Sequence, residues 1–416
     1  MLKCDLLVDS KDLRATLLKL KKDDDFTILL DMTAVDYSKF PDSTPSRFAV
    51  VYVLRSSDFK KETTVKAFVS DETLSVDTVS DIFPSANWAE REAYDQYGVI
   101  FLNHPNLKRV LNHKQFVGHP LRKDYKITQG QICTETEDLM DEMLPLLKSK
   151  GYTDEEIADL MLLNVGPSHP ASHGTIRNFV ALEGETIAAC VTEIGYLHRG
   201  FEKACEHHTY SQVIPYTDRL NYCSAILNNI GWAKAIEDMM KIEITPRAKM
   251  IRVVIGELSR IIDHFVCNAA NMVDLGGLTS LWYLFGARDQ AYDLLSKLTG
   301  ARLTNTYTRI GGLEFDLYDG FDKDLEEVLK TSEKAIEDVL SLIAHNKLFH
   351  DRTQDVGVIK ADFALANGIS GPNLRAAGVA HDLRKDKPYY GYENFDFDLV
   401  IGSHGDVYDR MMCRFE

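Results

Sequence analysis

Short runs of apolar and β-branched residues alternate with turn residues over the first 125 positions. Pro41 and Asp71 fall between the runs and mark turns. Runs of this length and composition are typical of β-strands. The pattern predicts strands at residues 26–32, 48–55 and 63–69.

A helix is predicted next to these strands. Asn87 can cap it, Glu90 stands where a capping box needs an acid, and Gly98 follows Tyr97 as a stop signal. Strands and helix together predict a small mixed α/β domain over residues 1–125.

The middle of the chain, residues 126–163, reads as a linker. Residues 128–137 are polar and without period, and two acidic amphipathic stretches at 139–147 and 154–163 predict short helices.

Helical periodicity dominates the remainder, residues 164–416. A β-hairpin comes first, with strands at 175–182 and 186–192. Thr245 followed by Pro246 is a strong helix start signal. We expect helices from about 217 to 242, 246 to 272, 279 to 300 and 322 to 345. The predicted class is therefore α+β: a small mixed α/β domain, then a larger, mainly helical domain that begins with a hairpin.

Composition and charge make several classes of protein less probable. The 416 residues carry a formal net charge of −16, which disfavours a nucleic-acid binder or a polybasic membrane-surface protein. No window approaches the roughly 20 apolar residues of a membrane-spanning helix. The start, Met1-Leu2-Lys3-Cys4-Asp5, is not that of a signal peptide.

The seven cysteines are widely spaced and form no Cys-x-x-Cys pair. We therefore expect this chain to hold no metal ion and no iron–sulfur cluster by itself. The pattern suits a reducing compartment with structural thiols.

Two histidines in the segment that leads into the hairpin are candidate ligand-binding residues. His169 and His173 are four apart, but Pro170 and Gly174 argue against a helix and hence against a helical zinc pair. Either the two are structural or merely exposed, or the loop presents an imidazole to a ligand near neutral pH.

Further candidates are a tyrosine, an arginine and two aspartates. On one helix, Asp218 and Tyr222 would share a face, and a satisfied core tyrosine is the favoured interpretation of Tyr222. Arg199 is either a surface residue or a cation held against a negative cofactor. Asp274 is either a helix-end residue or a carboxylate that orients an imidazole.

Taken together, these segments resemble respiratory complex I, the NADH:quinone oxidoreductase, with its C-type and D-type subunits joined in one polypeptide. Many motifs occur in the order of the family and cover nearly the whole chain. In the C-type part they include 31–37, 83–92, 97–99 and 118–125; in the D-type part they include 166–174, 197–203, 215–222, 246–248, 256–257, 300–302, 309–312, 355–357, 382–384 and 405–410.

The D-type part is in turn similar to the large subunit of nickel–iron hydrogenases. Those enzymes bind nickel through two Cys-x-x-Cys pairs, whereas the corresponding stretch here, residues 199–207, has only Cys205. The resemblance thus implies a hydrogenase-like fold whose vacated metal site has become a quinone pocket.

The resemblance also assigns roles. It places His173 and Tyr222 at the quinone head group, where both can bond a carbonyl oxygen and supply protons, with Asp274 paired to that histidine. His169 and Asp218 belong to the same quinone-binding set. Arg199 lies beside the terminal iron–sulfur cluster of a neighbouring subunit.

The implied partners are the iron–sulfur subunit that carries this cluster, the membrane subunit with the quinone channel, and the quinone itself. The resemblance also implies that the protein is a peripheral subunit on the cytoplasmic face of the bacterial inner membrane.

Two departures from the family carry consequences. After the Gly-Ala-Arg stretch that ends at Arg302, the family usually has a histidine where this chain has Thr304. Threonine does not titrate, which implies a cluster of lower, pH-independent potential and a low-potential quinone such as menaquinone.

The chain also ends at Glu416, before the family's C-terminal segment, so we expect further sequence or another polypeptide to complete the pocket.

Two alternatives stay open. The same quinone-reducing module could be fed by another donor, such as ferredoxin or a deazaflavin, because the donor site lies on other chains. A fused scaffold without catalysis is the other alternative, and the joint presence of His173, Tyr222 and Asp274 argues against it.

Overall fold

A computed structural model of the chain describes residues 4–136 and 138–416. Two expectations reach beyond these residues: the absence of a signal peptide concerns Met1–Lys3, and the predicted linker includes Glu137. Internal contacts divide the chain into two units, one comprising Met1–Ala204 with Ala366–Gly368 and the other comprising Cys205–Leu365 with Ile369–Glu416. The predicted boundaries near residues 125 and 163 stay predictions.

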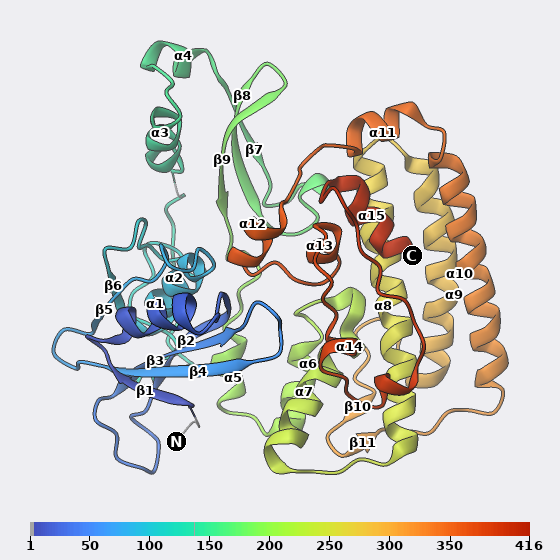
Figure 1. Cartoon of the computed structure of the whole chain (residues 1–416), viewed down its shortest axis with the longest axis horizontal. Helices are drawn as coiled ribbons and strands as arrows, with labels where there is room; N and C mark the ends of the chain where they lie inside the picture. The colour runs from blue at the N-terminus through green and yellow to red at the C-terminus, as the bar shows by residue number, and fades with distance from the viewer. Residues whose placement is uncertain (1–3, 137) are drawn as a thin grey trace. The chain divides into compact units, whose positions relative to one another are not determined.

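A four-stranded sheet forms the centre of the N-terminal part of the first unit (Figure 1). Its order is β1-β4-β3-β2; β1 runs parallel to β4, and the other neighbours are antiparallel. The three predicted strands are confirmed as β2, β3 and β4, and β1 is an addition. The strands are β1 (Leu6–Asp9), β2 (Ile28–Asp36), β3 (Phe48–Arg55) and β4 (Glu62–Val69).

Two helices pack with this sheet into one core. Helix α1 (Leu13–Asp23) contributes Leu13, Leu17 and Leu20, which recur at helical spacing and are buried. Helix α2 (Ala86–Tyr97) ends as predicted at Gly98, which adopts a left-handed φ of 79°. Two short parallel strands, β5 (Ser75–Asp77) and β6 (Ile100–Leu102), complete this region.

The predicted capping box of α2 is wrong. The helix begins at Ala86, before Asn87, so Glu90 lies inside it. Glu90 is fully buried and accepts hydrogen bonds from the Thr78 hydroxyl and from the Val79 backbone N–H at 2.8 Å. The Glu90 carboxylate therefore forms hydrogen bonds in the core of the domain and does not cap the helix.

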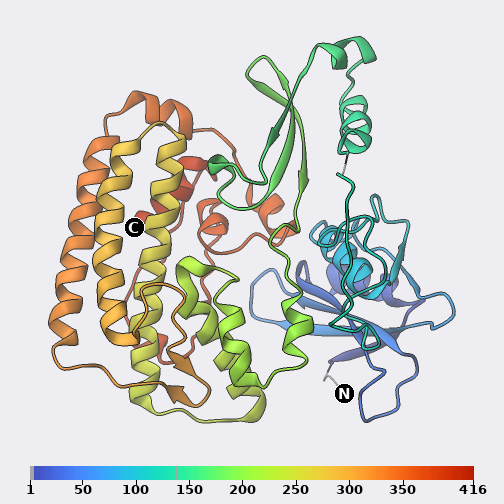
Figure 2. The same cartoon turned by 180° about the vertical axis from the view of Figure 1, so that it is seen from behind.

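The rest of the first unit is a second, three-stranded sheet with two short helices. Among the described residues between Leu102 and Met140 the chain forms no helix or strand, and Figure 2 shows this stretch from behind. The short helices expected here are present as α3 (Met140–Ser149) and α4 (Asp154–Asp159), followed by the antiparallel strands β7 (Met161–Val165), β8 (Arg177–Glu183) and β9 (Thr186–Glu193).

The predicted hairpin is thus confirmed as β8 and β9, but the helix expected at 154–163 is too long. A capping box between Thr153 and Glu156 starts α4, and Leu160 then takes an extended conformation. Residues 161–165 pair with β8 instead. An apolar run of this length fits a strand as well as a helix, and pairing decides between them.

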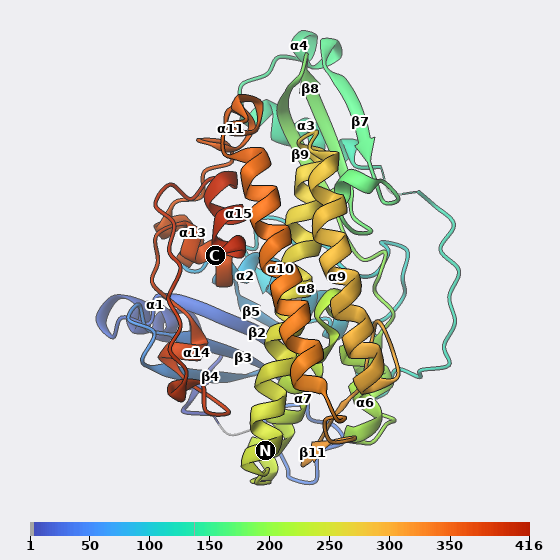
Figure 3. The ribbon, with the colours of Figure 1, turned by 90° about the vertical axis from the view of Figure 1, so that its right-hand side faces the viewer.

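Long helices build the second unit. Helices α8 (Pro246–Asp274), α9 (Leu278–Thr299) and α10 (Phe321–Ile343) stand side by side (Figure 3). The start signal at Thr245 is confirmed, because its hydroxyl accepts from the Ala248 N–H. Helix α9 starts at Leu278, one residue before the expected start, and its N-cap residue is Gly277.

The single helix predicted from 217 to 242 is wrong. The structure has α6 (Tyr210–Thr217), a break, the 3₁₀ turn η2 (Tyr222–Ser224) and α7 (Ala225–Met240). At this break, polar side chains form hydrogen bonds with neighbouring groups, as described below. These bonds replace the backbone hydrogen bonds of a continuous helix. Tyr222 and Asp218 therefore do not share one helix face.

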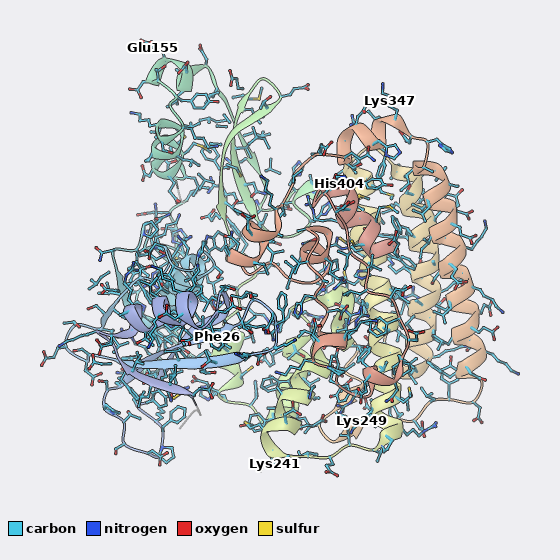
Figure 4. The ribbon with its side chains drawn as sticks, in the orientation of Figure 1. Phe26, Glu155, Lys241, Lys249, Lys347 and His404 are labelled. Carbon is cyan, nitrogen blue, oxygen red and sulfur yellow. The ribbon has the colours of Figure 1, made fainter. Side chains whose placement is uncertain are left out.

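The two ends of the helical unit are visible in Figure 4. Lys241 and Lys249 lie at one end, where α7 stops and α8 starts, and Lys347 lies at the opposite end, where α8 stops. The remaining elements are β10 (Thr308–Arg309), β11 (Gly312–Leu313), α11 (Lys347–Thr353), α12 (Ala361–Ala366), α13 (Gly371–Ala376), α14 (Leu383–Asp386), η3 (Tyr392–Asn394), α15 (Val407–Phe415) and, at the boundary of the units, α5 (Phe201–Cys205). The predicted α+β class is confirmed.

Candidate functional site

The predicted site residues are divided between the two units. His169, His173 and Arg199 belong to the first, while Tyr222 and its neighbours belong to the second. Each half is described by itself, and the meeting of His173 with Tyr222 stays a prediction.

The histidine loop joins β7 to β8 and contains one 3₁₀ turn, η1 (Pro170–Ser172). The His169 Nδ1 accepts the Ala171 backbone N–H at 3.1 Å, so this nitrogen carries no proton in that bond. His173 follows η1 with a left-handed φ of 49°, and both imidazoles are exposed. The hydrogen bond from Ala171 therefore fixes the His169 ring, whereas the His173 imidazole is exposed to solvent.

Ser172 stiffens the same loop. Its hydroxyl lies 2.6 Å from the His169 carbonyl oxygen and 2.7 Å from the Gly174 carbonyl oxygen. Both histidines thus flank a turn held by local bonds. The expectation that a loop, and not an α-helix, carries the two histidines is confirmed.

Arg199 lies in the loop after β9, before α5, and is exposed. Neighbouring Lys203 is buried and donates to the Arg122 carbonyl oxygen at 2.9 Å. This bond ties the start of α5 to the 118–125 motif, so the Arg199 loop has one fixed end.

Asp218 sits at the end of α6 and is only 3% exposed. Burial raises the pKa of its carboxyl, and a hydrogen bond from Asn229 opposes the rise. The Asn229 Nδ2 lies 2.5 Å from Asp218 Oδ1 and 2.9 Å from the Thr217 hydroxyl. Asp218 is therefore a buried acid that holds the break between α6 and α7.

Tyr222 is 55% exposed at the first position of η2, so it is not the core tyrosine that the sequence favoured. The preceding residue anchors it: Asn221 Nδ2 donates to Ser224 Oγ at 2.8 Å and to Asp263 Oδ1, on α8, at 3.2 Å. The turn thus presents a phenol outward from a fixed backbone.

Helix α9 links this turn to the loop that follows the helix. Arg288 and Tyr292 on α9 interact electrostatically with Cys223, next to Tyr222. The Arg302 guanidinium lies 5.8 Å from the centre of the same Tyr292 ring and pairs with Asp293. The structure therefore brings the Tyr222 turn and the Arg302 loop to one region of α9.

Thr304 follows in that loop with a left-handed φ of 55°. Its hydroxyl donates to the Leu303 carbonyl oxygen at 2.7 Å. Asn305, which is buried, bonds back to Ala301 and Thr299 and fixes the loop. Thr304 thus has a defined but unusual backbone position.

Asp274 is the last residue of α8 and is exposed. It lies eleven residues after Asp263, and a helix rise of 1.5 Å per residue separates the two by roughly 16 Å along the axis. Asp274 therefore lies away from the point where the Asn221–Tyr222 segment meets α8.

The sequence assigned no site role to Asn221, Asn229 or Asp263, whose hydrogen bonds hold the Tyr222 turn. A weak signal was present, because Asn and Ser side chains favour breaks over helix interiors. Over residues 4–136 and 138–416, no cluster of three or more His, Cys, Asp or Glu could hold a metal ion. No helix in the described part of the chain is both long and apolar enough to cross a bilayer.

Comparisons with known proteins match both parts of the chain. A family model described as respiratory-chain NADH dehydrogenase, 30 Kd subunit, matches residues 6–131, and one described as the 49 Kd subunit matches residues 274–416. The NADH-quinone oxidoreductase C/D subunit of Bdellovibrio bacteriovorus is 46% identical over 410 residues, which cover 98% of this chain and 71% of the relative. Proteins of the same name from Chromohalobacter salexigens and Psychrobacter cryohalolentis are each 37% identical and covered to 68% of their length.

Proposed function

Because the chain belongs to the family of NADH-quinone oxidoreductase C/D subunits, and is thus a subunit of an oxidoreductase complex, we propose that it forms one wall of the quinone-reduction pocket. One observation carries the proposal: Tyr222 is 55% exposed although Asn221 anchors its turn to α8. A phenol kept outward on a fixed backbone is suited to bind a polar group of a ligand.

Reduction of a quinone to a quinol consumes two electrons and two protons. The electrons arrive from the terminal iron–sulfur cluster of a neighbouring subunit, and Tyr222 and His173 each bond one carbonyl oxygen and pass it a proton. Asp274 pairs with His173 and favours its protonated form. His169 and Asp218 belong to the same proposed quinone-binding set, and each is held by the local bonds described above.

Arg199, Arg302 and Thr304 are proposed to face the partner's cluster. Arg302 sits in the same region of α9 as the Tyr222 turn, which supports a short path from the cluster to the quinone. Because Thr304 does not titrate, the cluster keeps a low potential that suits a quinone such as menaquinone.

The surroundings follow from the same proposal. The partners are other complex I subunits, in particular the iron–sulfur subunit with the terminal cluster and the membrane subunit with the quinone channel. The chain acts peripherally at the cytoplasmic face of the inner membrane, in a complex that couples quinone reduction to proton translocation. Residues 1–125 serve as a docking domain.

Tyr222→Phe in the assembled complex tests the proposal. The ring and its apolar contacts stay, while the hydroxyl that bonds and protonates the quinone is lost, so quinone reduction should fall about a hundredfold. Oxidation of the donor with an artificial acceptor should persist, because the electron-entry centres lie on other subunits. Tyr210→Phe, a tyrosine of α6 that is 49% exposed, is the matched control. Parental quinone reduction by the Tyr222 variant would reject the assignment and favour a scaffold role.

A further inference from the structure

A cavity of about 280 Å³ lies within the first unit, and none of the residues assigned to the quinone lines it. Its walls come from α2, from the loop 108–113 and from the chain that leaves β9. The last two approach so closely that a Cβ on Gly195 would lie 2.4 Å from the Leu111 carbonyl oxygen. The cavity thus has a fixed backbone wall that admits only glycine at that point.

Basic side chains line this cavity, and most of them are neutralised. Arg109 pairs with Asp95 at 2.6 Å, Arg177 pairs with Glu193 at 3.2 Å, and Lys108 pairs with Glu142. These three pairs account for all but one of the lysines and arginines that the structure describes in the lining.

Arg91 is the exception. It is 7% exposed and donates to two backbone carbonyl oxygens, of Lys108 at 3.3 Å and of Arg109 at 3.2 Å. Among the described residues it forms no ion pair, and its Nη1 has no hydrogen-bond partner. Asp95 is the acid whose charge influences it, but that carboxylate is bound by Arg109 and by backbone N–H groups of residues 110–112. Burial lowers the pKa of Arg91.

The Arg91 side chain is mostly buried, and the neighbouring Asp95 carboxylate is bound by other groups, so Arg91 has no carboxylate of its own. Its Nη1 is not among the enclosed polar atoms, so a carboxylate that enters the cavity can reach it and offset the partial desolvation of the guanidinium. The aromatic side chains of the cavity fit a protein ligand: Trp88 and Tyr196 are each 44% exposed, and the Arg91 guanidinium lies 5.4 Å from the Trp88 ring. Trp, Tyr and Arg are the residues that most often dominate protein–protein binding energy.

We propose that this cavity receives an acidic side chain from another subunit of the complex, with its carboxylate on Arg91 and its apolar stem against Trp88. The volume suits one or two side chains better than a drug-sized ligand, whose pockets start at about 300 Å³. The exposed Glu135 on the lining stays in water and leaves the inner, cationic part for the incoming carboxylate. The inference rests on membership of a multisubunit family and is independent of the quinone pocket.

Photo-crosslinking in the complete complex tests the docking. With Trp88→p-benzoylphenylalanine, we expect a crosslink to a peptide of another subunit that contains Asp or Glu, identified by mass spectrometry. Arg91→Gln should lower the yield of this crosslink about tenfold, since loss of one partner of a buried charge pair mainly speeds dissociation. Arg14→Gln, the same change of charge on α1 outside the cavity, should leave the yield unchanged.

Charge reversal then checks the contact itself. Arg91→Glu should release the crosslinked subunit, and a matching acid-to-Lys change in the crosslinked peptide should restore its association. Crosslinks confined to this chain, or no crosslink in a folded complex, would overturn the proposal. So would an unchanged yield with Arg91→Gln. The Tyr222→Phe complex should give the parental crosslink, which keeps failure of docking distinct from failure of quinone chemistry.

Discussion

Asn221 and Asp263 are 42 residues apart in sequence, yet the Asn221 Nδ2 lies 3.2 Å from the Asp263 Oδ1. The bond ties the residue before Tyr222 to the middle of α8. Asn228 adds a second tie, because its Nδ2 donates to the Asn221 carbonyl oxygen at 3.1 Å. The orientation of the phenol therefore depends on an amide that need not touch the quinone.

Asn221→Ala should weaken quinone reduction more than it weakens the fold. The bonds to Ser224 and Asp263 are lost, at a cost of about 1 kcal/mol in the free energy of unfolding. The misplaced Tyr222 should lower kcat for quinone about tenfold or more, because catalysis is sensitive to displacements of about 1 Å. Steady-state kinetics and denaturant titration measure the two effects. Asn394→Ala, an exposed amide bonded within its own turn, is the control. A parental kcat would show that Asn221 does not position Tyr222.

A buried ion pair holds the far end of α7 against α8. The two Arg252 Nη atoms each lie 2.8 Å from a Glu237 carboxylate oxygen, and Arg252 is 1% exposed. Arg252→Met leaves the carboxylate buried without its main partner, so the free energy of unfolding should fall by about 3–5 kcal/mol. The double variant Arg252→Met, Glu237→Leu should recover part of this loss. Denaturant titration of the chain gives both values, and a double variant as unstable as the single one would contradict the argument.

Glu90 predicts a pH dependence of the first unit. Burial raises the pKa of this carboxyl from 4.5 to about 7, although hydrogen bonds from Thr78 and Val79 oppose the rise. Between these values the folded protein binds more protons than the unfolded chain. Stability due to Glu90 therefore falls as pH rises from 4.5 to 7, by about 3 kcal/mol at about 1.4 kcal/mol per pH unit.

His104 acts in the opposite direction. It lies 3.9 Å from Glu90, and burial lowers its pKa, so its contribution to stability rises with pH up to the unfolded value of 6.5. Glu90→Gln isolates the carboxyl, because the histidine remains. Relative to the parent, this variant should gain about 3 kcal/mol of stability between about pH 4.5 and about pH 7.5. Denaturant midpoints at several pH values measure the gain, and a constant difference would mean that Glu90 does not titrate in this range.

Strands β2, β3 and β4 of the first unit could be predicted because short runs of apolar and β-branched residues are separated by turn residues. Strand β7 could not, since the run from Leu160 to Val165 has no period that separates a strand from a helix, and pairing with β8 decides. The break before Tyr222 was also missed. Asn229 and Asp263, which stabilise it, lie 11 and 42 residues from the groups they bind, beyond any local pattern.

The candidate site shows the same limit. His173, Tyr222 and Asp274 could be named because they match motifs of a known family. The break between α6 and η2 overturned the expectation that Asp218 and Tyr222 share a helix face, and the exposure of Tyr222 overturned the expectation of a core tyrosine. Arg91 gave no signal, because an uncompensated guanidinium can be recognised only once all carboxylates around it are placed.

Thr304→His should make the potential of the partner's terminal cluster depend on pH. Position 304 has a left-handed φ of 55°, a conformation that His adopts more readily than most residues, so the loop should tolerate the change. A histidine there can take up a proton when the cluster accepts an electron. The potential should then fall by up to about 60 mV per pH unit across the histidine's range. EPR-monitored redox titration of the complex at about pH 6 and about pH 8 measures this slope, with Thr331→His on α10 as the control. A potential equally flat in both variants would place Thr304 away from the cluster and remove the argument for a low-potential quinone.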